Sequence, residues 1–319
     1  MIWLTWRQHR IQALSAVGLL ILAGVFLGMH GQSLHDEYNR HVAGCLHQTS
    51  PSPACSLTVR SYFNEVARAE RLITWVNVIP GLVGAVVGAT LLAPEYENGT
   101  WRLVWTQGVT RTRWLVTKSA LIVSATLLFG AAMSWLFTWY REPLDKVSVD
   151  GRFSAQAFDT EGLSLAVYTL FALSLGALAG LLLRRTVAAI VVAFAVFLAV
   201  RLPAENYLRP HYQNPLTRYW SPTPPRSEKV PRRDWILSDG WLDASGRHLS
   251  HDEFRRIANA HADDASLVEY LRSHGMRSWE TYQPATRFWH FQLVEATLYV
   301  TLSALLLTAT VLCLRRRPF

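Results

Sequence analysis

Six long apolar runs alternate with polar segments along the chain. The hydrocarbon core of a bilayer is about 30 Å thick, so a helix that rises 1.5 Å per residue needs about 20 apolar residues to cross it. The runs approach that length, and none has a Lys or Arg in its apolar centre. They predict six membrane-spanning helices, at 13–29, 72–93, 114–140, 163–183, 186–202 and 288–314.

Two of these runs allow a second interpretation. The fifth has only 15 residues between Arg185 and Arg201, so it spans the bilayer only if its flanking side chains snorkel or the bilayer thins. A re-entrant hairpin is the alternative. The first run follows Arg7 and Arg10, as the core of a secretory signal does, but it is longer than such cores and no small-residue cleavage site follows it. We expect it to remain as a membrane anchor.

Basic residues predict the orientation. If the N-terminus is cytoplasmic, the internal segments are 1–10, 94–118, 184–185 and 315–319, and they carry Lys and Arg at about twice the density of the other loops. The positive-inside rule therefore predicts that both termini are cytoplasmic. Only three of the 31 basic residues are Lys, a usage that favours a bacterial source.

The composition supports this class of protein. Of the 319 residues, 50% are hydrophobic and 17% charged, against about 25% charged in soluble proteins. This excludes a disordered chain or a charged coiled coil. The net charge of +8 does not indicate nucleic-acid binding, because the charges flank apolar runs and occupy loops. We expect an all-α integral membrane protein with six transmembrane helices and a small α/β extracytoplasmic cap between helices 5 and 6.

Two cysteines lie in the first external loop, at 30–71. Cys45 and Cys55 flank a Ser/Pro-rich stretch, and an oxidising compartment favours a disulfide between them. Two free thiols are the alternative. Cys313 is alone near the end of the last helix, where we expect it to be a packing residue.

The cap is predicted within 203–286. After a Pro-rich linker, two Trp-containing apolar pieces flank Ser238, Asp239 and Gly240, which predicts a short hairpin with a turn at Asp-Gly. Ser250 and Glu253 form a capping box that begins a helix, and a second helical piece ends at Gly275. Two histidines there, His248 and His251, are possible metal ligands, but no further ligands appear at usable spacing, so no metal site is expected.

Four sequence motifs of ATP-binding and hydrolytic enzymes are absent from the chain. It has no G-x-x-x-x-G-K-[ST] loop for ATP phosphates, and no H-E-x-x-H, G-x-S-x-G or kinase signature. We therefore expect no catalytic residues and no cofactor in this chain. Any energy input has to come from another subunit.

The loop between the second and third runs reads P-E-Y-E-N-G-T-W-R-L-V-W-T-Q-G. Pro94 is expected to end the preceding helix, and Thr100 can cap a short helix in which Trp101, Val104 and Trp105 share one face. This helix either rests in the lipid interface or fills a groove on a cytoplasmic partner. Two acidic residues in the same loop, Glu95 and Glu97, are not explained by the positive-inside rule.

Glu295 is the one acidic residue clearly inside an apolar run. A carboxylate in hydrocarbon costs on the order of 2 to 4 kcal/mol at mid-membrane, so we expect it to face the bundle. It either bonds a neighbouring helix or the headgroups, or it marks a polar point on a translocation route or subunit seam.

Glycines four residues apart predict close helix packing; the pairs are Gly24 and Gly28, Gly84 and Gly88, and Gly176 and Gly180.

The segment E-Y-E-N-G-T-W, the following T-Q-G-V-T-R-T-R-W, six spans and a W-R-Q-H-R segment before the first span together resemble the type-2 permease family of ATP-binding-cassette (ABC) exporters. The resemblance implies that the loop after the second helix is a coupling helix that docks on a separate ATPase subunit, which holds ATP and Mg. The residues that match this interface are Glu95, Glu97, Gly99, Thr100, Trp101, Arg102 and Trp105.

The resemblance further implies a second permease copy or a paralogue, contact with membrane lipid, and export of a hydrophobic or amphiphilic molecule from a bacterial cytoplasmic membrane. The apolar runs and loops divide the chain into helices 1 to 5 at 1–202 with the coupling loop at 94–113, the cap at 203–286, and helix 6 with a basic tail at 287–319. The external loop at 203–286 is larger than the minimal family pattern. The alternatives are a non-transporting membrane sensor or assembly protein and, third, a membrane-embedded enzyme.

Overall fold

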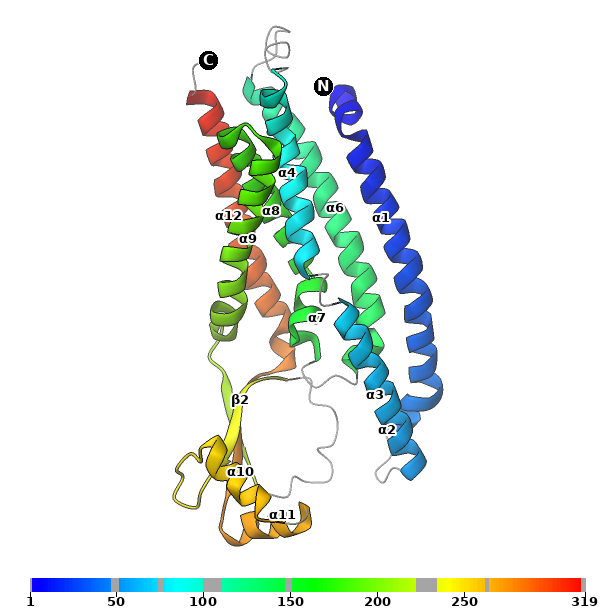
Figure 1. The fold of residues 1–319 in the computed structure, drawn as a ribbon, viewed down its shortest axis with the longest axis vertical. Helices are drawn as coiled ribbons and strands as arrows, with labels where there is room; N and C mark the ends of the chain where they lie inside the picture. The colour runs from blue at the N-terminus through cyan, green and yellow to red at the C-terminus, as the bar shows by residue number, and fades with distance from the viewer. Residues whose placement is uncertain are drawn as a thin grey trace.

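The computed structural model describes residues 2–46, 52–73, 77–99, 111–146, 151–221, 234–261 and 264–316. These residues form a helical bundle with a small sheet at one end (Figure 1). Among them, six helices are long and apolar enough to cross a membrane, and each contains most of one predicted run. The six helices are α1 (Ile2–Glu37), α4 (Ile79–Glu97), α6 (Arg111–Asp145), α8 (Ser164–Leu183), α9 (Thr186–Pro203) and α12 (Phe288–Arg316).

The bundle has two distinct ends. Figure 1 shows both termini at one end, together with the last turn of α4 and the first turn of α6. The small sheet and the helical segments at 38–46 and 53–73 lie at the opposite end (Figure 1). We call these the terminal end and the cap end.

Two bounds of the predicted spans are corrected. The second run was expected to begin at 72, but α4 begins at Ile79, and residues 72–73 complete α3 (Pro53–Ile73). Pro94 was expected to end the helix, yet α4 continues to Glu97. Asn98 then closes this helix, because its backbone and side-chain nitrogens both donate to the carbonyl of Pro94.

The fifth run is a helix and not a re-entrant hairpin. Helix α9 continues through a π-turn (Ala204–Leu208) and a 3-10 turn (Arg209–His211), which extends the continuous helical segment to 26 residues. This length removes the need for a thinned bilayer. Arg201 does not snorkel: it is 4% exposed and lies inside the bundle.

Helices α4 and α8 approach each other through glycines. A Cβ at Gly88 would lie 2.0 Å from the carbonyl oxygen of Leu173, and one at Gly176 would lie 2.7 Å from that of Ala85. Two of the three predicted glycine pairs therefore form a helix interface. The third does not, because a Cβ at Gly24 or Gly28 would meet nothing within 4 Å.

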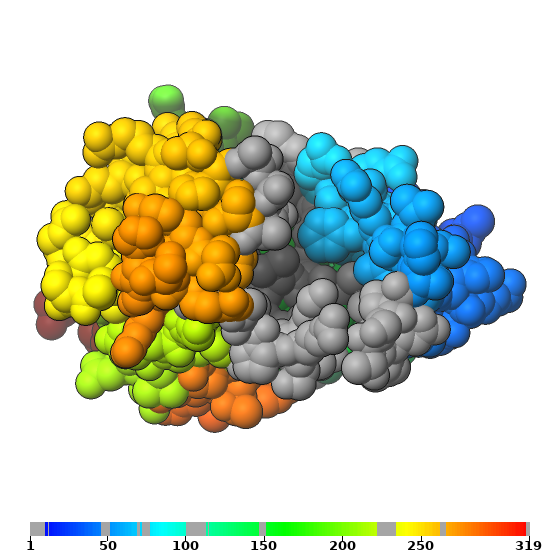
Figure 2. All heavy atoms as spheres, turned by 90° about the horizontal axis from the view of Figure 1, so that it is seen from below, coloured from blue at the N-terminus to red at the C-terminus, as the bar shows by residue number. Residues whose placement is uncertain are grey.

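Between α1 and α4, the described residues are mostly helical. Helix α1 is followed by a π-turn (Tyr38–Val42), and the short helix α2 (Ala43–Leu46) precedes the antiparallel α3. Helix α3 packs on the extension of α1 through buried Tyr62, whose hydroxyl donates to the carbonyl of Leu34 at 3.3 Å. Figure 2 shows that this helical hairpin and the cap lie on opposite sides of the cap end.

The cap contains a three-stranded antiparallel sheet in the order β1-β3-β2. The predicted Asp-Gly hairpin is wrong: Ser238, Asp239 and Gly240 all lie within β2 and pair with β3. The capping box of Ser250 and Glu253 is present, as predicted. The elements are β1 (Leu216–Trp220), β2 (Trp235–Leu242), α10 (His251–Asn259), α11 (Asp264–Ser273) and β3 (Arg277–Gln283).

An aromatic cluster joins the cap to the bundle. Between α6 and α8 the chain makes a 3-10 turn (Gly151–Phe153) and the short buried helix α7 (Ala155–Thr160). Phe153 stacks on Trp235 of β2, with ring centroids 5.6 Å apart, and packs edge-on against Phe291 of α12. The cap is therefore in direct contact with the segment that closes this end of the bundle.

Candidate functional site

Glu95 fastens the end of α4 to α6. Its carboxylate, 7% exposed as a residue, accepts a hydrogen bond from the ammonium of Lys118 at 2.6 Å. The same ammonium donates to the carbonyl of Leu91 at 2.9 Å. Because Leu91 lies one helical turn before Glu95, Lys118 bonds two successive turns of α4. Glu95 lies in the last turn of α4, and Lys118 lies within the first three turns of α6.

Glu97 fastens the same end of α4 to α9. Its carboxylate accepts hydrogen bonds from the backbone nitrogen of Thr186 at 3.2 Å and from the hydroxyl of Thr186 at 2.7 Å. Arg185, the N-cap residue of α9, makes no side-chain capping bond. Glu97 therefore caps α9 from a different helix, where a negative charge also interacts favourably with the helix dipole.

The remaining predicted coupling residues lie mostly outside the described residues. Gly99 begins the turn after α4 with a φ of +69°, a conformation that favours glycine. The other four, together with the short helix predicted for them, lie in the part of the chain that is not described; they are Thr100, Trp101, Arg102 and Trp105. The structure thus brings Glu95, Glu97 and Gly99 to one corner of the terminal end.

Glu295 lies inside the bundle near the cap end and is fully buried. Its carboxylate accepts a hydrogen bond from the hydroxyl of Tyr168 on α8 at 2.5 Å. It also accepts one from the Nε of Arg209 at 3.0 Å, which forms an ion pair. The expectation that this side chain faces the bundle is therefore met, and its partners lie on two other elements.

A second carboxylate completes this cluster. Asp159 of α7 accepts a hydrogen bond from Arg209 at 2.9 Å and another from Arg201 of α9. Arg201 also pairs with Glu205 at 3.3 Å. Among the buried members, the two carboxylates of Asp159 and Glu295 balance the two guanidinium groups, as buried ions require, and Glu205 is partly exposed. We call the set Asp159, Tyr168, Arg201, Arg209 and Glu295 the buried charge cluster.

Sequence reasoning missed both arginines and Asp159. A usable signal exists, because Arg201, Glu205 and Arg209 recur every four residues and therefore share one helical face. That pattern becomes visible only when the helix is extended beyond residue 202. Asp159 gives no comparable signal, since it precedes the fourth apolar run in a segment without periodicity.

Gln292 holds the turn between α7 and α8 against α12. Its side-chain oxygen accepts from the backbone nitrogens of Leu163 and Ser164 at 3.0 and 3.1 Å, and its nitrogen donates to the carbonyl of Phe158 at 2.9 Å. Gln292 and Glu295 are three residues apart on α12, so one face of this helix supplies both polar contacts.

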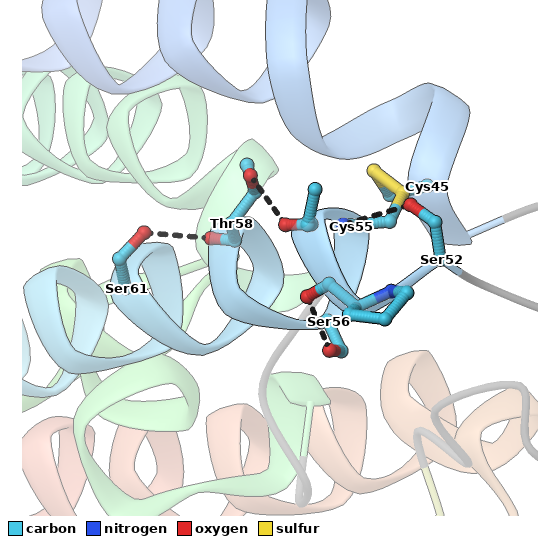
Figure 3. The surroundings of a disulfide bond; sticks show 8 residues. Cys45, Ser52, Cys55, Ser56, Thr58 and Ser61 are labelled. Atoms are coloured by element: carbon cyan, nitrogen blue, oxygen red, sulfur yellow. Dashed lines mark hydrogen bonds between the residues drawn. A yellow bond between two sulfur atoms is a disulfide. The ribbon is translucent and has the colours of Figure 1, made fainter.

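The structure joins Cys45 of α2 and Cys55 of α3 in a disulfide, with Cα atoms 5.5 Å apart (Figure 3). The backbone nitrogen of Cys55 donates to the hydroxyl of Ser52 at 3.2 Å. The disulfide links α2 to α3 at the end of the helical hairpin that lies away from the terminal end (Figure 1). Cys313 is half-buried with a free thiol.

The two cap histidines do not share a metal site in the structure. His248 packs its ring edge-on against Trp279, with centroids 4.8 Å apart, and His251 is the first residue of α10. Within the described part of the chain, no three His, Cys, Asp or Glu side chains are grouped so as to hold a metal ion.

Six apolar helices and buried ion pairs within them define a multi-pass integral membrane protein. Residues 17–209 match the family model described as "ABC-2 membrane transporter related". The match covers more than half of the chain, and the chain belongs to this family. It ends at Arg209, just before the cap, and includes most of the buried charge cluster. No curated protein and no solved structure matches the chain.

Proposed function

We propose that this chain is the permease subunit of an ATP-driven ABC exporter in a bacterial cytoplasmic membrane, moving a hydrophobic or amphiphilic molecule outward. Membership of the family supports a membrane transporter permease without catalytic residues of its own. ATP and Mg bind a separate ATPase subunit, because the sequence has no phosphate-binding loop. A second permease copy or a paralogue completes the pathway.

In this proposal the terminal end faces the cytoplasm. It holds the basic residues Arg184 and Arg185 in the turn between α8 and α9, and Arg315 and Arg316 at the end of α12. Their position at one end supports that orientation by the positive-inside rule. The cap and the disulfide-bonded hairpin are then extracytoplasmic.

The single observation that carries the proposal is the double attachment of α4 at the terminal end. The residues after Gly99 dock on the ATPase, and the α4 turn from which they leave is bonded to α6 through Lys118 and to α9 through Thr186. A displacement of the docked segment therefore acts on three spanning helices at once. Glu95 is a positioning residue, because its carboxylate is buried.

The buried charge cluster closes the opposite end. Arg201 of α9 pairs with Asp159 of α7, and Arg209, in the turn that follows α9, pairs with Asp159 and with Glu295 of α12. The hydroxyl of Tyr168 adds α8. A pathway that opens between these helices has to separate Glu295 from Arg209. We propose that Glu295 responds to that opening, as a polar point at the outer end of the translocation route.

Co-purification with the ATPase tests the proposal. The double variant Trp101→Ala/Trp105→Ala should abolish ATPase recovery while membrane insertion stays normal, because the docking side chains are removed. The matched control is Trp135→Ala/Trp289→Ala, which removes two exposed tryptophans from α6 and α12. Unchanged recovery in the first variant would show that its tryptophans rest in the lipid interface, and would overturn the docking role.

A further inference from the structure

An apolar groove separates α1 from α4 along the bundle, with α6 as its floor. Its part nearer the terminal end has a volume of about 490 Å³ and lies between Ile11 and Leu19 on one wall and Val83 and Val87 on the other. The part nearer the cap end has a volume of about 190 Å³ and reaches His30 and Tyr140. Figure 1 shows α1 at the edge of the bundle, beside α6.

The two parts form one continuous groove. Both are lined by Leu19, Val83 and Phe129, one residue from each of the three helices. From Ile11 to His30 the α1 wall rises roughly 28 Å at 1.5 Å per residue. That length matches the hydrocarbon core of about 30 Å, so the groove runs from one leaflet to the other.

The groove has one polar end. His30 and Tyr140 meet there, with the ring nitrogen Nδ1 3.0 Å from the phenol oxygen. Over most of the remaining length the walls are aliphatic or aromatic. Leu19 and Leu82 are 40% and 47% exposed, so the groove is open to the surroundings along its side. A long apolar chain fits these walls, whereas an ion or a sugar would find few partners.

The part of the groove nearer the cap end has the smaller volume, about 190 Å³, and it favours a thin occupant. A single extended hydrocarbon chain is thinner than a helix and can follow the full length.

We propose that this groove is a binding site for one long-chain amphiphile taken from the bilayer. Its apolar chain lies along α1, and its polar head hydrogen-bonds with the His30–Tyr140 pair. The role of this site in transport rests on the proposed permease function. The amphiphile is then the class of substrate, and the groove is the site that binds it. Occupancy by itself requires neither ATP nor an ATPase subunit.

Photolabelling tests the proposal. The full chain is placed in vesicles of phosphatidylethanolamine and phosphatidylglycerol with a single-chain phosphatidylcholine that carries a diazirine in its acyl chain, and labelled residues are mapped by mass spectrometry. We expect several-fold more label on Val83 and Phe129 than on Val187 and Val191, which are exposed on α9 outside the groove.

Two matched variants on α6 sharpen the test. Ala125→Phe adds a ring inside the groove and should reduce labelling of its walls several-fold, whereas Ala132→Phe adds the same ring at an exposed position outside it and should leave labelling unchanged. Equal labelling of the groove and α9, or equal effects of the two variants, would identify ordinary surface lipid and overturn the site. So would cross-linking of two copies through Leu19→Cys. Photolabelling does not depend on the ATPase subunit. A chain that fails to co-purify with an ATPase can therefore still be tested for this site, and the two proposals can fail independently.

Discussion

Glu95 and Glu97 are two residues apart on α4 but lie in different surroundings. Glu95 is buried in the bundle and paired with Lys118. Glu97, the last residue of α4, is exposed, and its carboxylate bonds to the first residue of α9. A buried charge whose partner is removed keeps its desolvation cost and loses its compensation. Removing one member of the Glu95–Lys118 pair alone should therefore weaken the α4–α6 contact.

A double-mutant series tests this dependence. Lys118→Met should lower the free energy of unfolding by about 3 kcal/mol, because it removes the ammonium that Glu95 faces at 2.6 Å inside the bundle. Glu95→Gln/Lys118→Met should recover most of that loss, since both members of the pair are then neutral. Thermal unfolding of the purified protein in detergent measures both. A double variant as unstable as Lys118→Met alone would contradict the ion-pair explanation.

Glu295→Gln tests the buried charge cluster. The amide keeps hydrogen bonding but removes the charge that Arg209 faces at 3.0 Å. We expect normal assembly and ATPase recovery with reduced transport, because the charge is the feature proposed to respond to opening. Glu142→Gln, at an exposed carboxylate on α6, is the control and should transport normally. Normal transport by Glu295→Gln would leave the carboxyl with a structural role only.

For single residues, the sequence predicts that Glu295 is buried, but it does not predict which side chains bond to it. Glu295 was expected to face the bundle because hydrocarbon does not tolerate a lone carboxylate, and it does. Arg209 was missed because the helix reaches it only through a π-turn and a 3-10 turn, after the apolar run has ended at residue 202. Composition alone does not show that a helix continues through such polar residues.

Helix α8 is the centre of the bundle because small residues let α4 lie directly against it. Ala85 and Ala89 are fully buried at this contact, and the glycines of both helices remove the side chains that would hold them apart. The same spacing on α1 makes no such contact. Glycines four residues apart therefore form an interface only where another helix lies opposite them. The sequence does not show which of the glycine pairs has such a neighbour.

Gly88→Ala should separate these helices. Its new Cβ would lie 2.0 Å from the carbonyl oxygen of Leu173, a backbone atom that cannot rotate away. Overpacking of this kind costs about 1–3 kcal/mol, so the thermal midpoint should fall. Gly28→Ala is the matched control on α1, where nothing lies within 4 Å, and its midpoint should not fall, because alanine is the better helix former. Equal midpoints would show that α4 and α8 shift without cost.

The cap shows how pairing partners override a local turn signal. Asp239 and Gly240 are typical turn residues, but β3 supplies a partner for every residue from 238 to 242. The side chain of Trp279 lies across Gly240, where an added Cβ would be 2.9 Å from its indole nitrogen. The glycine thus admits a neighbouring ring and does not make a turn. The capping box was predictable because it depends only on residues three apart.

The hairpin of α2 and α3 gives a prediction at the scale of one element. Cys45 and Cys55 should be oxidised in protein taken from native membranes, because the proposed orientation exposes them to an oxidising compartment. Mass spectrometry with alkylation before and after reduction measures this. Closing so short a loop stabilises by about 3 kcal/mol in the chain-entropy model, so Cys45→Ser/Cys55→Ser should unfold at a lower temperature. Free thiols in the native protein would also count against the orientation.

The whole molecule has polar attachments at both ends and an apolar middle. At the terminal end two carboxylates tie α4 to α6 and α9, and at the cap end the buried charge cluster ties α7 to α9 and α12. Helix α9 is common to both sets. A change at one end therefore has a direct mechanical route to the other, which a permease driven from the cytoplasm requires.

The orientation of these ends in the membrane is the last prediction. The basic turn between α8 and α9 should be cytoplasmic and the cap extracytoplasmic, because a bilayer retains Arg-rich segments on the cytoplasmic side. In a Cys313→Ser background, Ser245→Cys places a thiol in an exposed turn of the cap, and Arg185→Cys places one in the α8–α9 turn. A membrane-impermeant maleimide should label Ser245→Cys in intact cells and Arg185→Cys only after permeabilisation. The reverse pattern would place the α4–α6 connection outside, beyond the reach of any cytoplasmic ATPase, and would overturn the orientation and the permease proposal together.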